Sequence, residues 1–262
     1  MEKNSKNQTI ILKIGGSIIT KKFSSRPQIK EKKVRQLAKE LKLFTRRFPK
    51  TKIILLHGAG SFGHPLVYKY KLLKQPLTGP RLLGFAKTIC STRQLANLLT
   101  EIFADAKLPV LPLQASAMSP LNLRYLKQML ETGFIPLLGG DIGLTKQNQS
   151  ILVSADKLAV VLAKAFPNSR VIFATDVNGV FDKFPTSDNA NPIPLLSRKG
   201  IKSMLKKMSE KNTRYDVTGG MAGKLKTILV LKNKEIVVFN GLKSGNLIKA
   251  LTGGQIGTRL IL

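Results

Sequence analysis

The chain has 262 residues, of which 43% are apolar and 22% charged, so a largely disordered chain is excluded. Its one cysteine, Cys90, excludes an internal disulfide framework and a cysteine-based zinc site. No apolar run reaches about 18 residues and the N-terminus lacks an apolar core, so we expect a cytoplasmic protein without a membrane segment. The net charge of +30 either attracts anions, namely nucleic acid, anionic membranes or phosphorylated small molecules, or reflects a generally basic proteome.

Short apolar runs alternate along the chain with longer amphipathic stretches. We predict strands at residues 9–14, 52–56, 109–113, 134–138, 170–174, 235–239 and 258–262. We predict helices at residues 28–48, 81–106, 121–132, 154–165, 199–207 and 222–232. The strands are apolar nearly throughout, as in strands that helices cover on both faces. The alternation therefore predicts an α/β fold with a mainly parallel central sheet.

Three segments of the chain are rich in glycine. They read ILKIGGS at residues 11–17, IILLHGAGSFGH at 53–64 and DVTGGMAGK at 216–224. Adjacent glycines let backbone N–H groups approach a ligand, and successive N–H groups bind anions. Two of the segments also carry a lysine, Lys13 and Lys224. Together they predict a polyphosphate site.

The middle segment matches two common nucleotide motifs only in part. Gly58, Gly60 and Gly63 fit the spacing of a dinucleotide loop, but no acidic residue follows before Glu101 to hold a ribose. A P-loop would need lysine and a hydroxyl residue where His64 and Pro65 stand. Neither motif therefore explains the segment.

Several side chains have both a structural and a functional interpretation. His64, in a glycine loop at a strand end, is expected to contact a phosphate, whereas His57 is expected to be structural. Cys90 is expected to be a small buried residue. Phe85, Ile89, Leu95 and Leu99 have helical spacing and form either core or the wall of an apolar pocket.

Taken together, these segments resemble the amino acid kinase superfamily and, within it, the isopentenyl phosphate kinases. The resemblance runs from Ile11 to about Thr258. The GG and TDVNGV segments are typical of the superfamily, and the histidine of GAGSFGH is the narrower signal. The segments that carry the resemblance are ILKIGGSIITKK (11–22), LLHGAGSFGHP (55–65), GF (84–85), PLLGGD (136–141), VSADK (153–157), ATDVNGVFD (174–182), DVTGGMAGK (216–224) and FNG (239–241).

The resemblance implies a three-layer αβα sandwich forming a single domain over residues 1–262. Its N-terminal half, about 1–150, would bind the acceptor, and its C-terminal half, about 151–262, would bind ATP. The implied reaction is phosphorylation of isopentenyl phosphate by ATP with Mg²⁺, giving isopentenyl diphosphate and ADP for isoprenoid precursor synthesis. The implied partners are these small molecules and a second copy of the chain in a homodimer, with no specific nucleic acid or membrane.

The resemblance also assigns roles to residues. The implied catalytic residues are Lys13, Lys22, His64 and Lys224. The implied acceptor-binding residues are Ala59, Gly60, Gly63 and His64. The implied ATP-binding residues are Lys13, Gly15, Gly16, Ser17, Gly60, Asp176, Gly220 and Lys224. No metal ligand is firmly assigned, and Asp156 is the candidate; Asp176 lies near the nucleotide or instead organises the lysines.

The chemistry of these residue types suits phosphoryl transfer. A loose transition state needs positioning and neutralisation of charge, which lysines supply. The acceptor oxygen of a phosphate monoester is already anionic near neutral pH, because its second pKa is about 6. A general base is therefore unnecessary.

The sequence departs from the family pattern at five positions. Ala59 replaces a glycine, and Gly139 replaces a histidine. Lys21 precedes Lys22 where the family often has aspartate, so either lysine is a candidate for the transferred phosphate. Lys157 replaces an acidic residue, and Ile89 replaces a histidine in the helix beside the acceptor tail.

Two alternatives to this function follow from the sequence. The first is a kinase of the same superfamily with another acceptor, such as fosfomycin, another small phosphate or phosphonate, or UMP. The second is a nucleic-acid-binding protein, suggested by the charge of +30. Aromatic residues are only 6% of the chain, which disfavours a base-stacking surface.

Overall fold

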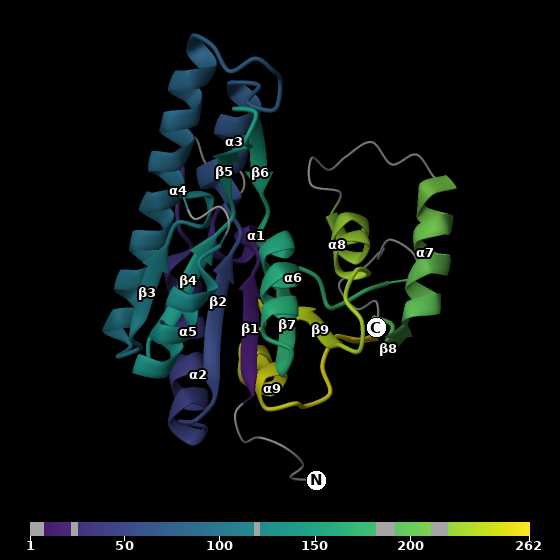
Figure 1. Cartoon of the computed structure of the whole chain (residues 1–262). Helices are drawn as coiled ribbons and strands as arrows, with labels where there is room; N and C mark the ends of the chain where they lie inside the picture. Colours follow the sequence, from purple (N-terminus) through teal and green to yellow (C-terminus); the bar gives the residue numbers. More distant parts are fainter. Residues whose placement is uncertain (1–7, 22–25, 118–120, 182–191, 211–219) are drawn as a thin grey trace.

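A computed structural model of the chain describes residues 8–21, 26–117, 121–181, 192–210 and 220–262 (Figure 1). Within these ranges one eight-stranded sheet has the order β3-β4-β2-β1-β7-β9-β10-β8. Its strands are β1 (Thr9–Ile14), β2 (Lys52–His57), β3 (Val110–Leu113), β4 (Ile135–Gly139), β7 (Ser169–Thr175), β8 (Leu195–Ser197), β9 (Glu235–Asn240) and β10 (Thr258–Ile261).

Neighbouring strands of the sheet are parallel, except that β10 runs antiparallel to β9. The central strand β1 pairs Lys13 with Leu56 of β2 on one side and with Phe173 of β7 on the other. Because the strands are parallel, the loops that follow β1, β2, β4 and β7 lie along one edge of the sheet. Two of the glycine-rich segments are therefore brought to that edge.

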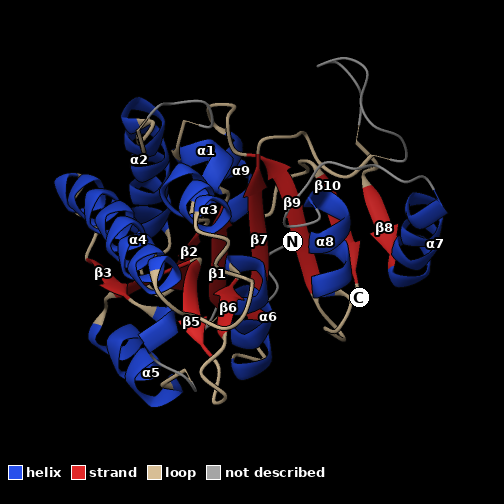
Figure 2. Cartoon of the chain, turned by 90° about the horizontal axis from the view of Figure 1, so that it is seen from above, coloured by secondary structure: helices blue, strands red, loops and turns tan. Residues whose placement is uncertain are grey.

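Helices cover both faces of the sheet, which confirms the predicted three-layer arrangement (Figure 2). One core joins the sheet to α2 (Glu31–Arg47), α4 (Pro80–Asp105) and α9 (Asn246–Leu251). The other core joins it to α5 (Leu123–Thr132), α6 (Ala155–Ala165), α7 (Arg198–Glu210) and α8 (Gly220–Ile228).

The alternation of side chains along β1 decides which way Lys13 points. Ile10 and Leu12 belong to the core under α2 and α4, and Ile11 belongs to the core under α6 and α8. Successive side chains of a strand point to opposite faces, so Lys13 lies on the face of Ile11. The strand therefore presents its lysine toward α6 and α8.

A separate two-stranded hairpin, β5 (Asp141–Leu144) and β6 (Ser150–Val153), follows β4. The TKQNQS segment, residues 145–150, forms its turn, where the N–H of Thr145 bonds to the carbonyl of Gln149. Two further helices that the sequence did not predict, α1 (Gly16–Ile19) and α3 (Gly60–Lys69), begin inside the first two glycine-rich segments. Among the described residues no helix is long and apolar enough to cross a membrane.

The four apolar residues of α4 whose role the sequence left open fall into two groups. Leu95 and Leu99 are buried in the core beneath α2, whereas Phe85 and Ile89 pack on a smaller cluster of Val67, Leu72 and Ile142. Cys90 is exposed, so the prediction that it is buried is wrong. It lies off the helix face that carries Leu95 and Leu99.

Candidate active site

The first two glycine-rich loops meet backbone to backbone. A Cβ atom on Gly16 would lie 2.6 Å from the nitrogen of Gly60, and one on Gly58 would lie 2.6 Å from the nitrogen of Gly16. Gly60 also has a φ of +51°, a conformation that side chains disfavour. The glycines are therefore required by this close approach, which places the start of α1 against the start of α3.

Thr20, a residue that the sequence analysis did not select, ties these two loops together. Its buried hydroxyl donates to the carbonyl of Gly16 at 2.8 Å and accepts from the N–H of Ser61 at 3.0 Å. A threonine in an apolar segment gives no functional signal in the sequence. Only the fold reveals that it fixes the distance between the loops.

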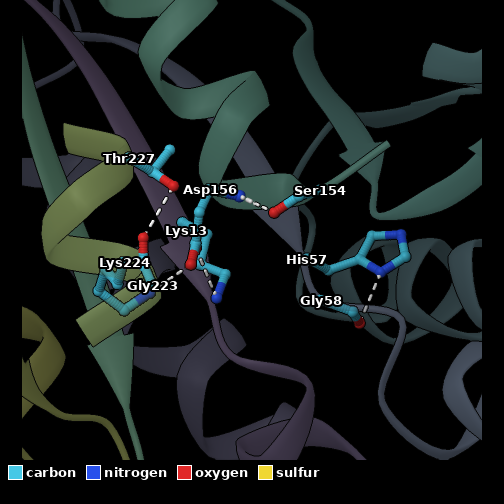
Figure 3. A network of polar contacts seen from close by, with 8 residues as sticks. All are labelled: Lys13, His57, Gly58, Ser154, Asp156, Gly223, Lys224 and Thr227. Atoms are coloured by element: carbon cyan, nitrogen blue, oxygen red, sulfur yellow. Dashed lines mark hydrogen bonds and ion pairs between the residues drawn. The ribbon is translucent and has the colours of Figure 1, made fainter. Parts of the chain in front are cut away.

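Beside the loops, one carboxylate joins two lysines from distant parts of the chain (Figure 3). The Nζ of Lys13 on β1 lies 2.9 Å from Oδ1 of Asp156, and the Nζ of Lys224 on α8 lies 2.8 Å from Oδ2. Asp156 stands in the first turn of α6, where Ser154 accepts a hydrogen bond from its N–H. The cluster carries two positive charges against one negative charge.

Burial shapes the titration of this cluster. The pKa of Lys224 is lowered to about 8, chiefly by burial and next by the nearby charge of Lys13, although Asp156 opposes both. Burial alone would raise the pKa of Asp156, but Lys13 and Lys224 outweigh it and hold that pKa below its ordinary value. The Nζ of Lys224 also lies 4.5 Å from the centre of the Phe173 ring, a cation–π contact. Near neutral pH Lys224 is therefore mainly a cation beside an ionised Asp156.

The loop assigned to the acceptor leads into α3, with Ala59 at the N-cap and His64 exposed on the helix. A Cβ atom on Gly63 would lie 2.6 Å from the methyl of Ala59, so that methyl points toward Gly63. The departure at position 59 is thus accommodated by a glycine one helical turn later. Glycine is therefore required at position 63 for packing, independently of any ligand that the loop binds.

The departure at Gly139 has a similar explanation. A Cβ atom on Gly139 would lie 2.5 Å from Nε2 of His57, so the imidazole occupies the space of a side chain at position 139. His57 is buried at the end of β2, and burial lowers its pKa to about 4. The expectation that His57 is structural agrees with its burial.

The remaining predicted residues lie around this edge of the sheet. Gly15 bonds to the carbonyl of Ala174 at the end of β7, and the carbonyl of Ser17 accepts from Lys30. Asp176 is exposed just beyond β7, and Gly220 begins α8 with a φ of +46°. Lys21 is exposed, while Lys22 lies outside the described residues.

The carboxylate that organises the lysines is Asp156. The sequence analysis offered that role only to Asp176, as an alternative to a position near the nucleotide, and offered Asp156 as the candidate metal ligand. Both oxygens of Asp156 are engaged by lysines. Among the described residues no group of three or more His, Cys, Asp or Glu side chains could hold a metal ion.

The structure defines an α/β protein with a mainly parallel sheet, and one edge of that sheet carries two facing glycine loops and a lysine–carboxylate cluster. Glycine N–H groups and lysines are the groups that commonly bind phosphates. Residues 8–240 match the family model described as "Amino acid kinase family". The chain belongs to the amino acid kinase family, and the predicted membership is confirmed.

Individual relatives narrow the comparison. The chain is 30% identical to an isopentenyl phosphate kinase of Methanocaldococcus jannaschii, over 95% of this chain and 97% of that protein. It is also 30% identical to one of Methanothermobacter thermautotrophicus, over 96% and 98% of the two chains. A solved structure titled "X-ray structures of isopentenyl phosphate kinase" superposes with a TM-score of 0.80 at 27% identity, covering 96% of this chain and all of that one.

Proposed function

We propose that the protein transfers the γ-phosphoryl group of ATP to isopentenyl phosphate, forming isopentenyl diphosphate and ADP. The observation that carries the proposal is the Lys13–Asp156–Lys224 cluster beside the facing glycine loops. It is supported by the likeness to isopentenyl phosphate kinases over nearly the whole chain.

In this proposal the two lysines neutralise the charge of the transferring phosphates. Lys13 and Lys224 are held by Asp156 and have little freedom to move, so their charges are preorganised. The N–H groups of Gly16 and Ser17 would face ATP from one loop, and Gly60 would add one from the other. Gly15, whose N–H bonds to the carbonyl of Ala174, would shape the ATP-binding loop. Gly220 and Asp176 approach the nucleotide, and Lys22 joins the catalytic lysines.

The acceptor phosphate would sit on the loop of Ala59, Gly60 and Gly63, with His64 holding it. Its oxygen attacks the γ-phosphorus while the bond from that phosphorus to the bridging oxygen of ADP breaks. The oxygen is already anionic, so no side chain has to remove a proton. This accounts for a site in which the carboxylate beside the loops, Asp156, is engaged by lysines.

The hydrocarbon tail of the acceptor requires an apolar surface. The cluster of Val67, Leu72 and Ile142, with Phe85 and Ile89 packed on it, lies between α3, α4 and the β5–β6 hairpin. We propose that the tail packs on this cluster at Phe85 and Ile89, which are partly exposed. The interpretation of Phe85 and Ile89 as pocket wall belongs to this proposal.

Magnesium and the assembly state complete the proposal. Mg²⁺ commonly binds through substrate phosphates, one or two carboxylates and water, with no dedicated protein cage. It would neutralise charge on the ATP phosphates.

We also propose a homodimer, which light scattering during size exclusion measures directly.

The experiment is ADP release from ATP and Mg²⁺ with isopentenyl phosphate, dimethylallyl phosphate, UMP, fosfomycin and acetylglutamate as acceptors. We expect turnover with isopentenyl phosphate at kcat/KM of about 10⁴ M⁻¹s⁻¹ or above and little with the last three. Turnover confined to another acceptor would support the ATP site but would reject isopentenyl phosphate as the acceptor.

Two variants test the assigned roles in the same assay. His64→Ala should lower kcat/KM for isopentenyl phosphate about tenfold or more, through loss of a charged hydrogen bond of about 1.5–3 kcal/mol. Lys13→Ala should lower kcat in a protein whose circular dichroism is unchanged. Wild-type kinetics in either variant would show that the replaced residue does not have the assigned role.

A further inference from the structure

Thr20 lies at the contact between the two facing glycine loops, and it is 0% exposed. A Cβ atom on Gly60 would lie 2.2 Å from Oγ1 of Thr20, so the hydroxyl is packed directly against the backbone of that glycine. The hydroxyl bonds to the carbonyl of Gly16 in the first loop and to the N–H of Ser61 in the second. One buried hydroxyl group therefore contacts both loops at once.

The bond from Ser61 to Thr20 takes the place of a helix cap. Helix α3 begins at Gly60, and the first N–H groups of a helix have no carbonyl partner within it. The N-cap residue is Ala59, which has no side-chain oxygen to accept from these N–H groups. Thr20 supplies the oxygen from a segment 41 residues earlier in the chain. The start of α3 is thus held by the loop that follows β1.

The backbone of Thr20 is fixed independently of its hydroxyl. Its N–H donates to the carbonyl of Gly16 at 2.9 Å, and the residue forms an antiparallel bridge with Ile29. Beside this bridge the N–H of Lys21 donates to the carbonyl of Gln28 at 2.9 Å. These bonds give the hydroxyl a defined place between the loops, and they do not depend on the side chain.

We propose that Thr20 is a positioning residue for phosphoryl transfer, an inference that rests on the proposed function. In that function the loop of Gly16 and Ser17 binds ATP, and the loop of Ala59 and Gly60 binds the acceptor phosphate. The attacking oxygen and the γ-phosphorus must come within about 3–3.5 Å of each other, and a misplacement of about 1 Å can cost about 100-fold in rate. Thr20 is buried and touches neither substrate. Its hydroxyl sets the distance between the loops that hold them.

Thr20→Val keeps the shape of the side chain and removes the hydroxyl. The rate of a single turnover with ATP, Mg²⁺ and isopentenyl phosphate, measured by rapid quench, should fall about tenfold to 100-fold. The Kd of ATP alone and that of isopentenyl phosphate alone, measured by calorimetry, should stay within about twofold of the wild type, because each substrate is held by one loop. Thr20→Ser keeps the hydroxyl and should recover most of the rate.

Thr45→Val is the matched control. The hydroxyl of Thr45 donates to the carbonyl of Lys42 within α2, and this end of α2 leads to the start of β2, at the opposite edge of the sheet. Its single-turnover rate should equal that of the wild type. Circular dichroism and the urea midpoint report whether each variant is folded. If Thr20→Val does not fold, Thr20→Ala compared with Thr20→Ser gives the same test of the hydroxyl.

Two results would overturn the positioning role. One is a wild-type single-turnover rate in a folded protein that lacks the hydroxyl. The other is a Thr20→Ser protein as slow as Thr20→Val, because the methyl group and not the hydroxyl would then be responsible.

Failure of the proposed function would give a different result, since the wild type itself would then not turn over isopentenyl phosphate. In that case amide hydrogen exchange, which needs no substrate, still tests the contact. The N–H of Ser61 should exchange about tenfold faster or more in Thr20→Val than in the wild type. Equal exchange in the two proteins would show that the hydroxyl does not hold the second loop, and the proposal would be rejected.

Discussion

Asp156 holds two lysines that lie 211 residues apart in the sequence. The carboxylate reduces the repulsion between the ammonium groups of buried Lys224 and partly buried Lys13 and fixes both of them. Removing one partner of a buried charged cluster is costly, because the remaining charges lose their compensation. Asp156 is therefore the residue whose replacement tests the cluster as a unit.

We expect Asp156→Asn to lower kcat about tenfold or more, since both lysines lose the group that orients them. In the wild type, kcat/KM should fall above pH 8, where Lys224 loses its proton. Without Asp156 the pKa of Lys224 drops below about 8, so this fall should move to lower pH. The measurement is kcat/KM against pH, with Asp105→Asn as an exposed control. An unshifted profile would exclude Lys224 as the titrating group.

The contribution of Lys224 to the free energy of unfolding should change with pH in the direction opposite to activity. Between about pH 8 and 10.5 the unfolded chain keeps the proton of Lys224 and the folded protein has lost it. The contribution of Lys224 to the free energy of unfolding therefore rises with pH in this window. If activity falls with pH while the contribution of Lys224 to the free energy of unfolding rises, the loss of activity comes from the lost charge and not from unfolding.

Among the secondary-structure elements, α2 and α9 are joined by one buried side chain. Glu40 of α2 is 7% exposed and accepts from the N–H groups of Gly245 and Ile248, each at 3.0 Å. These N–H groups belong to the first turn of α9 and have no partner within that helix. Glu40 thus caps a helix more than 200 residues further along the chain.

Glu40→Ala should lower the free energy of unfolding by about 1.5–3 kcal/mol, the range for losing a hydrogen bond to a charged group. Urea denaturation measures the change as a lower midpoint. Glu31→Ala on the same helix removes an exposed ion pair with Arg35 and should cost less than about 1 kcal/mol. Equal effects of the two variants would show that the capping contacts are not the source of stability.

Sequence patterns predicted the elements of the two cores well and the elements around the site poorly. The strand at Thr9–Ile14 was predicted with its observed bounds, because every residue but one is buried. The helices α1 and α3 were missed because their glycines signal turns, and β5 and β6 because their burial is irregular. Glycine loops predicted the phosphate site, but a single Asp at the start of a helix did not reveal that Asp156 bridges two lysines.

The division of the chain into an acceptor half and an ATP half near residue 150 stays a prediction. The sheet itself joins the two parts, because β1 pairs with β2 on one side and with β7 on the other. The site lies along this junction, with Lys13 from the first part and Lys224 from the second. A pattern read along the chain locates each lysine, but only the pairing of strands brings them to one carboxylate.

The whole molecule carries 44 basic and 14 acidic residues, and both proposed substrates are anions. Such a field should speed the encounter between protein and substrate, and salt should weaken the effect. The Debye length shortens from about 30 Å at 0.01 M salt to about 8 Å at 0.15 M. We therefore expect kcat/KM for isopentenyl phosphate to fall as NaCl increases, while kcat at saturating substrate stays nearly constant. A kcat/KM independent of salt would mean that the charge has no part in substrate capture. Binding of duplex DNA, measured in parallel, tests the nucleic-acid alternative. A steep decrease of DNA affinity with salt would show that the same positive charge also binds nucleic acid.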